Sequence, residues 1–239
     1  MTLALGCSST QKDGPASAPA SAPAAHEHGH GEHHGHAEHH GKGGEGFHHR
    51  FDDAEKWAKR FDDPKRDAWQ KPAEVVKAAS VESGATVADI GAGTGYFLPY
   101  LSEAVGASGQ VLALDVEPSL VAYMKARVEK DGLGNVTVDQ IPYDDPKLPA
   151  GGVDRVLIVD TWHHIDARIA YTQKLAAGLA PGGQVVIVDF TKDSPEGPPP
   201  EHRLPAAKVI EELKAGGLEA EVVEETLPRQ YIVIGRKAP

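Results

Sequence analysis

Apolar residues gather in five short runs between residues 87 and 190, and a polar residue or a glycine closes each run. Runs of this length and composition predict buried strands of a parallel sheet. They cover residues 87–90, 110–114, 135–139, 153–159 and 184–190.

The segments between these runs have the apolar spacing of helices. Residues 96–105 and 119–130 predict two of them, each with apolar side chains that recur on one face. A third is expected to begin at a cap formed by Asp166 and to carry Ile169 and Leu179 among its apolar residues. Alternating strands and helices predict a doubly wound sheet whose ligand crevice lies at the carboxyl ends of the strands.

The C-terminal part departs from this alternation. A proline-rich segment, residues 194–205, is expected to form a loop over the mouth of the crevice. Residues 206–215 predict a helix, and residues 219–226 and 230–235 predict two strands joined by a short turn. The expected fold is therefore α/β and Rossmann-like, with a mostly parallel seven-stranded sheet that ends in an antiparallel hairpin.

Residues 51–80, which precede the first strand, predict two or three short helices. Asp52 or Asp53 can cap the first of these, and Trp57 and Phe61 would share one of its faces. The Asp-Pro pair that follows is expected to end it.

The first strand runs into three glycines at alternate positions, Gly91, Gly93 and Gly95. Glycine permits positive φ and lets the backbone approach a ligand with no Cβ in the way. A dinucleotide-binding turn needs G-x-G-x-x-G, but Tyr96 occupies the place of its last glycine, which disfavours an NAD-dependent oxidoreductase. Asp115 lies at the tip of the next strand, where a carboxylate can accept hydrogen bonds from ribose hydroxyls.

The pattern D-x-G-x-G-x-G resembles motif I of the class I S-adenosylmethionine-dependent methyltransferases. The sequences VDTWHHI and LAPGGQVVIVDF are similar to later motifs of that family, particularly in its quinone-biosynthesis and small-molecule branches. The resemblance covers about residues 73–237. It implies S-adenosyl-L-methionine as the cofactor and methyl transfer to a small-molecule acceptor as the reaction.

The resemblance also implies where the cofactor binds. Asp89 and the glycine-rich loop would hold its methionine portion, Asp115 its ribose and Asp144 its adenine, with Asp145 as the competing choice. The expected cofactor-binding residues are Asp89, Gly91, Ala92, Gly93, Thr94, Gly95, Tyr96, Asp115, Val116 and Asp144.

In methyltransferases of this class the segment before motif I commonly folds over the cofactor and the acceptor. The resemblance therefore implies that residues 51–80 form a helical lid on a methyltransferase domain of residues 51–239. Trp69 and Gln70 can take part in this lid; the alternative is that Trp57, Phe61 and Trp69 simply pack the segment on the sheet.

Three residues that follow the fourth strand lie where an acceptor would enter, and they are the candidate catalytic groups: Asp160, His163 and His164. One of them can orient or deprotonate the acceptor. Adjacent residues at the start of a helix point in different directions, so at most one of the two histidines is expected to act. The alternative is that they cap the helix and pack beneath the lid.

Composition narrows the choice of partners. The 239 residues include 24 Lys and Arg against 35 Asp and Glu, a net charge of −11, and the basic residues form no cluster in the sequence. Because binding to phosphates requires clustered basic side chains, no nucleic-acid partner is expected.

Residues 1–50 differ in composition from the rest and are expected to form a disordered tether. Leu3–Ser9 resembles a bacterial lipobox, which implies a lipid anchor at Cys7 and a protein that faces the periplasm from a membrane. Only six residues precede Cys7, and none of them is basic, so a full signal sequence is missing. The alternative is a cytoplasmic protein with an incidental cysteine in its tail.

The tract from His26 to His49 holds ten of the thirteen histidines. Imidazoles at this density can bind Zn²⁺, Ni²⁺ or Cu²⁺ loosely, although their irregular spacing predicts no closed site. The default alternative is a solvated, pH-sensitive tether. Together with Cys7, the tract leaves a second function open: a non-catalytic lipoprotein that binds adenosylmethionine or handles metal ions.

Overall fold

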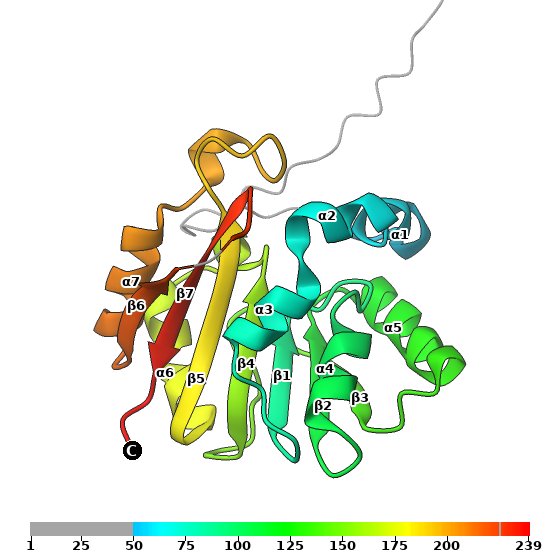
Figure 1. Ribbon diagram of the computed structural model, residues 1–239, viewed down its shortest axis with the longest axis horizontal. Helices are drawn as coiled ribbons and strands as arrows, with labels where there is room; N and C mark the ends of the chain where they lie inside the picture. The colour runs from blue at the N-terminus through cyan, green and yellow to red at the C-terminus, as the bar shows by residue number, and fades with distance from the viewer. Residues whose placement is uncertain (1–49, 225) are drawn as a thin grey trace, which may run out of the picture. The chain divides into compact units, whose positions relative to one another are not determined.

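The computed structural model describes residues 50–224 and 226–239 (Figure 1). Cys7 and the tract from His26 to His49 lie outside the described residues, so the lipid anchor and metal binding stay predictions.

The described residues build one seven-stranded sheet in the order β3-β2-β1-β4-β5-β7-β6 (Figure 1). Strands β1 to β5 run parallel to one another, and β7 runs antiparallel to both β5 and β6. This confirms the expected doubly wound sheet with a C-terminal hairpin. The strands are β1 Thr86–Ile90, β2 Gln110–Asp115, β3 Val136–Gln140, β4 Val153–Val159, β5 Leu179–Phe190, β6 Glu219–Val223 and β7 Gln230–Arg236.

Helices cover both faces of the sheet, and each face has its own apolar core. One core joins the sheet to α3 (Pro72–Ala78), α4 (Leu98–Val105) and α5 (Pro118–Asp131). The other joins it to α6 (Arg168–Gly178) and α7 (Ala206–Ala215). A sheet buried on both faces explains why its strands read as continuous apolar runs.

Short elements gather at the carboxyl ends of the parallel strands, at the top of Figure 1. They include α1 (Ala54–Phe61), α2 (Asp67–Gln70) and the loop before α7. The Asp53 side chain caps α1 by accepting from the N–H of Lys56, so Asp53 is the capping residue of the two candidates. The remaining short elements are η1 Pro64–Arg66, η2 Trp162–His164 and η3 Pro200–His202.

The predicted helix after Asp166 differs from the structure at both ends. Ala167, with φ of 45°, is the N-cap of α6, and Leu179 opens strand β5 because it pairs with Val153 at the start of β4. Ile169 is 43% exposed, since α6 turns its other side toward the sheet. The prediction for this helix was therefore wrong about its cap and about Leu179, whereas Ile169 lies in the helix as expected.

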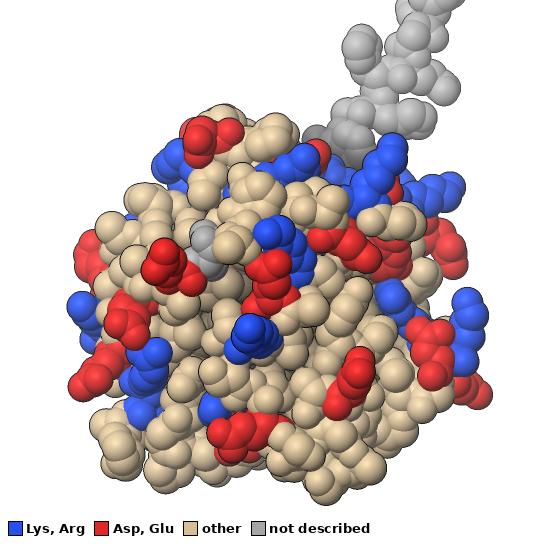
Figure 2. Space-filling model, in the orientation of Figure 1, with Lys and Arg blue, Asp and Glu red and all other residues tan. Residues whose placement is uncertain are grey.

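Among the described residues, no helix is both long and apolar enough to cross a bilayer. Basic and acidic side chains alternate over the face of the molecule shown in Figure 2.

Candidate functional site

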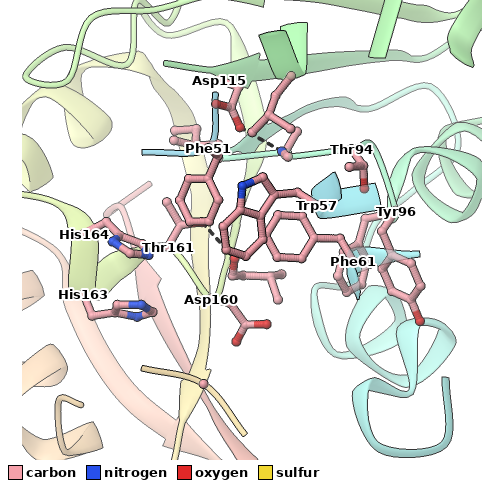
Figure 3. Close-up of a pocket in the computed structure, with 18 of the residues that line it drawn as sticks. Phe51, Trp57, Phe61, Thr94, Tyr96, Asp115, Asp160, Thr161, His163 and His164 are labelled. Carbon is pink, nitrogen blue, oxygen red and sulfur yellow. Dashed lines mark hydrogen bonds between the residues drawn. The ribbon is translucent and has the colours of Figure 1, made fainter. Parts of the chain in front are cut away.

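A cavity of about 610 Å³ opens at the carboxyl ends of β1, β2 and β4, beneath α1 and α2 (Figure 3). The strand order reverses between β1 and β4, which is where ligands bind in sheets of this kind. Of the expected cofactor-binding residues, those that line this cavity are Asp89, Gly91, Ala92, Gly93, Thr94, Tyr96, Asp115 and Val116.

The glycine-rich loop after β1 forms one wall of the cavity. Gly91, Gly93 and Gly95 all have positive φ, between 62° and 82°. A Cβ at Gly91 would lie 2.4 Å from the Thr161 side chain, and a Cβ at Gly95 would lie 2.8 Å from Leu98, so close packing demands glycine at both positions. At Gly93 the space is open up to the lid, which leaves room for a ligand to approach the backbone.

Asp115 lies against this loop, as expected from the sequence. Its carboxylate accepts hydrogen bonds from the N–H groups of Gly93, at 2.8 Å, and Glu117, at 2.9 Å. Burial raises the pKa of Asp115 to about 6, although these hydrogen bonds act in the opposite direction. The carboxylate therefore fixes the loop and the end of β2 together.

Asp89 is 2% exposed and lies at the end of β1. Its Oδ2 atom is buried and makes no hydrogen bond to any described residue. Burial and the neighbouring Asp115 raise the pKa of Asp89 to about 7. A buried carboxylate oxygen without a partner is costly unless a ligand satisfies it, and two acidic groups side by side favour a cationic ligand. The sulfonium and ammonium groups of S-adenosylmethionine fit this requirement.

Asp160 belongs to a closed ring of four side chains. Arg66 donates to Gln70 at 2.9 Å, Gln70 donates to Gln230 at 2.8 Å, and Gln230 donates to Asp160 at 2.6 Å. Arg66 closes the ring on the other oxygen of Asp160 at 3.4 Å. Burial raises the pKa of Asp160 to about 7 despite Arg66, and its φ of 53° is unusual for a residue with a side chain. The ring connects α2, the end of β4 and the start of β7.

His163 and His164 both line the cavity, but their partners differ. His163 is 4% exposed, and its Nδ1 lies 2.9 and 3.0 Å from the two oxygens of Asp189. Burial acts to lower the pKa of His163, but the Asp189 carboxylate outweighs it, so the pKa lies above the ordinary 6.5. His164 contacts the ring of Phe51, with 5.8 Å between ring centroids. The Asp189 carboxylate thus fixes the orientation of the His163 ring.

Three aromatic rings of the N-terminal segment lie together over the cavity: Phe51, Trp57 and Phe61 (Figure 3). Trp57 contacts Phe51 at 4.8 Å and stacks on Phe61 at 5.4 Å between ring centroids. This agrees with the expected shared face of Trp57 and Phe61, and it covers the glycine-rich loop with apolar surface.

Polar contacts fasten this lid to the loop. Asp62 accepts from the hydroxyl of Thr94 and from Arg127, both at 2.9 Å, and Arg127 also donates to the carbonyl oxygen of Thr94. The Tyr96 hydroxyl donates to Asp67. These contacts were missed from the sequence, because nothing in the spacing pairs α1 with α5.

Two expected cofactor residues lie outside the cavity. The Asp144 side chain is 86% exposed and lies 3.9 Å from Lys174, whereas its neighbour Tyr143 lines the cavity and donates to Glu117. Gly95 packs on Leu98 in the interior instead. The structure therefore does not bring Asp144 to the site, because the chain at this point turns Ile141 and Tyr143 toward the cavity.

Trp69 lines the cavity, while Gln70 is fully buried in the ring with Asp160. Within the described residues, no group of three or more His, Cys, Asp or Glu side chains could hold a metal ion.

Comparison with known proteins agrees with this geometry. Residues 87–183 match a family model described as a methyltransferase domain. The chain is 29% identical over 118 residues to the ubiquinone/menaquinone biosynthesis C-methyltransferase UbiE of Pseudomonas putida. That match covers 49% of this chain and 46% of the relative, so the chain spans about half the length of the curated relatives it matches.

Solved structures give longer matches. A SAM-dependent methyltransferase from Aquifex aeolicus is 33% identical with a TM-score of 0.72, over 77% of this chain and 98% of that one. Phosphoethanolamine N-methyltransferase 2 of Haemonchus contortus, solved with S-adenosyl-L-methionine, has a TM-score of 0.60 at 15% identity, over 72% and 53% of the two chains. The second match concerns the fold alone. By the Aquifex match, and by the motif and sheet that it shares, this chain belongs to the class I S-adenosylmethionine-dependent methyltransferases.

Proposed function

We propose that this protein transfers a methyl group from S-adenosylmethionine to a small-molecule acceptor in the cavity beneath α1 and α2. One observation carries the proposal. The open glycine-rich loop lies beside two buried carboxylates, and one of these, Asp89, has an oxygen that no described residue hydrogen-bonds. This combination suits a ligand with a cationic amino-acid end and a polar nucleoside.

Different residues bind the methionine, ribose and adenine portions of the cofactor. Asp89 and the backbone of the glycine-rich loop hold the methionine portion, and Asp115 accepts hydrogen bonds from the ribose. At the adenine end, Ile141 and Tyr143 pack against the base in place of the contact that the resemblance implied for Asp144, because they line the cavity and Asp144 does not.

When bound, S-adenosylmethionine supplies a methyl group that its sulfonium already activates. The protein therefore needs mainly to align the acceptor and exclude water. The aromatic rings of the lid exclude water. An acceptor that arrives protonated gives its proton to Nε2 of His163, while Asp189 holds Nδ1–H and orients the ring. Asp160 and His164 remain candidate acceptor contacts.

The test uses the full chain with S-adenosylmethionine labelled in its methyl group and a bacterial metabolite extract. We expect labelled small molecules to form, and the label to fall sharply with Asp115→Ala. If S-adenosylhomocysteine binds but no acceptor is labelled, the alternative of a non-catalytic adenosylmethionine-binding protein replaces this proposal. If NADH binds instead, the cofactor assignment is wrong.

For the N-terminal segment, we propose a lipid at Cys7 and loose metal binding between His26 and His49; the sequence alone supports both. Cys7→Ser is expected to move the protein from the membrane fraction to the soluble fraction. Deletion of residues 26–49 is expected to abolish zinc binding of micromolar affinity, and zinc binding only at millimolar concentrations dismisses the metal role.

A further inference from the structure

One end of the cavity, away from the glycine-rich loop, is lined by flat apolar groups. Trp69 of α2 lies 6.0 Å from Phe190, between ring centroids, and Pro198 and Pro199 line the same cavity. The Arg229 guanidinium lies 5.3 Å from the Trp69 ring. We call Trp69, Phe190, Pro198, Pro199 and Arg229 the acceptor slot.

One wall of the slot is rigid, because close packing on Phe190 and hydrogen bonds from the buried Arg203 hold the loop of residues 192–203. A Cβ at Gly197 would lie 2.5 Å from the Phe190 ring, so the loop backbone lies directly on that ring. Arg203, 7% exposed, donates to the carbonyl oxygens of Lys192, Ser194 and Pro198 at 2.6 to 2.9 Å. A wall built in this way selects a ligand by shape.

Positive charge lies in the slot, at Arg229, and behind its wall, at Arg203. Arg203 does not line the cavity, and it forms no ion pair with a carboxylate in the described part of the chain. Arg229 pairs with Glu196 at 3.2 Å, but the two side chains are 28% and 44% exposed. An ion pair this exposed is weak, and a ligand carboxylate can replace Glu196 at little cost. Of the acidic groups that line the cavity, Asp89 and Asp115 lie on the side of the glycine-rich loop, and Asp160 is held by Arg66 and Gln230.

We propose that the methyl acceptor is a planar, largely apolar molecule with an anionic substituent, a carboxylate or a phosphate. Its flat part lies against Trp69 and Phe190, and its anionic group takes the place of Glu196 at Arg229. This inference rests on the proposed function and adds the class of substrate. It follows from the flat groups that surround Arg229 and from the exposed Glu196, which a ligand anion can replace as the partner of Arg229.

The experiment measures binding to the full-chain protein saturated with S-adenosylhomocysteine. Three probes of equal shape are titrated by calorimetry: 2-naphthoate, 2-naphthyl phosphate and the neutral 2-naphthamide. We expect at least one anionic probe to bind about tenfold more tightly than the amide, the effect of one charge-assisted hydrogen bond. The comparison of the two anions separates a carboxylate acceptor from a phosphate acceptor.

Substitutions at Arg229 and Glu196 test whether these residues cause the preference for the anionic probe. Arg229→Gln is expected to reduce the preference for the anion to about twofold or less, Arg229→Lys to retain part of it, and Glu196→Gln to tighten anion binding about two- to threefold. Arg236→Gln is the matched control, because Arg236 forms a similar exposed pair with Glu221 on the β6–β7 hairpin and does not line the cavity.

Equal affinity for anion and amide, or a preference that survives Arg229→Gln, overturns the inference, and so does the failure of all three probes to bind. In each of these cases S-adenosylhomocysteine still binds, so the proposed function stands. Loss of S-adenosylhomocysteine binding itself would count against the proposed function first.

Discussion

At the scale of single residues, the site depends on carboxylates that are buried at the ends of neighbouring strands. Asp115 has two backbone partners, whereas one oxygen of Asp89 has no hydrogen-bond partner in the part of the chain that the structure describes. Asp115 therefore holds the glycine-rich loop in place, and Asp89 has an oxygen that can bind a ligand. His163 adds a base whose ring is fixed by Asp189.

Asp115→Ala should weaken the binding of S-adenosylhomocysteine by about 10- to 100-fold, since hydrogen bonds to a charged group contribute about 1.5–3 kcal/mol. Isothermal calorimetry measures the change. Asp139→Ala is the control, because Asp139 is an exposed carboxylate on the adjacent strand β3. Similar losses in both variants would show that the effect is not specific to the ribose site.

The His163–Asp189 pair predicts the pH dependence of methyl transfer. His163 must be neutral to accept a proton, so the rate should rise with pH through a pKa above 6.5. Asp189→Asn removes the charge that raises this pKa, and the acid limb should therefore move to lower pH while the maximal rate falls. The measurement is kcat/KM against pH, and His164→Gln should leave the limb in place. An unchanged limb in Asp189→Asn contradicts the role of His163.

At the scale of elements, polar contacts fasten the end of α1 to the glycine-rich loop and to α5. Asp62 joins it to Thr94 in the loop and to Arg127 on α5. The side chains of the Asp62–Arg127 pair are about a quarter exposed, so the pair is neither free in solvent nor deeply buried. It suits a lid that closes over a ligand and opens again.

Asp62→Ala should speed the dissociation of S-adenosylhomocysteine about two- to tenfold, because one partly exposed ion pair and one hydrogen bond are lost. Stopped-flow displacement measures this rate. Asp131→Ala removes the other carboxylate beside Arg127, 3.6 Å away on the same helix, without touching the lid. Equal effects of the two variants would mean that Asp62 does not fasten the lid.

The elements also explain what the sequence could predict. Strands and the glycine-rich loop were predictable because apolar runs and glycine spacing are local signals, and Asp115 follows from the parallel register of β1 and β2. The pairs Asp62–Arg127 and Arg66–Asp160 were not, since the two members of each pair lie far apart in the sequence. Asp144 was predicted by its distance along the chain, but the loop after β3 turns it toward Lys174.

At the scale of the whole molecule, the buried acids link stability to pH. The pKa values of Asp89, Asp115 and Asp160 are raised to about 7, 6 and 7 from an ordinary value of 3.8. The folded state binds these protons more tightly than the unfolded state. Their contribution to stability is therefore full below pH 3.8 and is lost as the pH rises through about 6 to 7.

Asp89→Asn should flatten this dependence. Relative to the wild type, the free energy of unfolding of the variant should gain about 1–3 kcal/mol between pH 5 and pH 8, since one pKa unit corresponds to about 1.4 kcal/mol. Urea denaturation of the ligand-free protein at both pH values measures it. A parallel pH dependence in both proteins would show that Asp89 ionises normally in the folded state.

The four-membered ring through Asp160 has a consequence for biosynthesis. Gln70 and Gln230 are 160 positions apart, and the ring that orients Asp160 needs both. During translation the first five strands can pair while Gln230 is still inside the ribosome, yet the ring around Asp160 is then incomplete. A nascent chain should therefore gain the finished pocket only when its last strand inserts between β5 and β6.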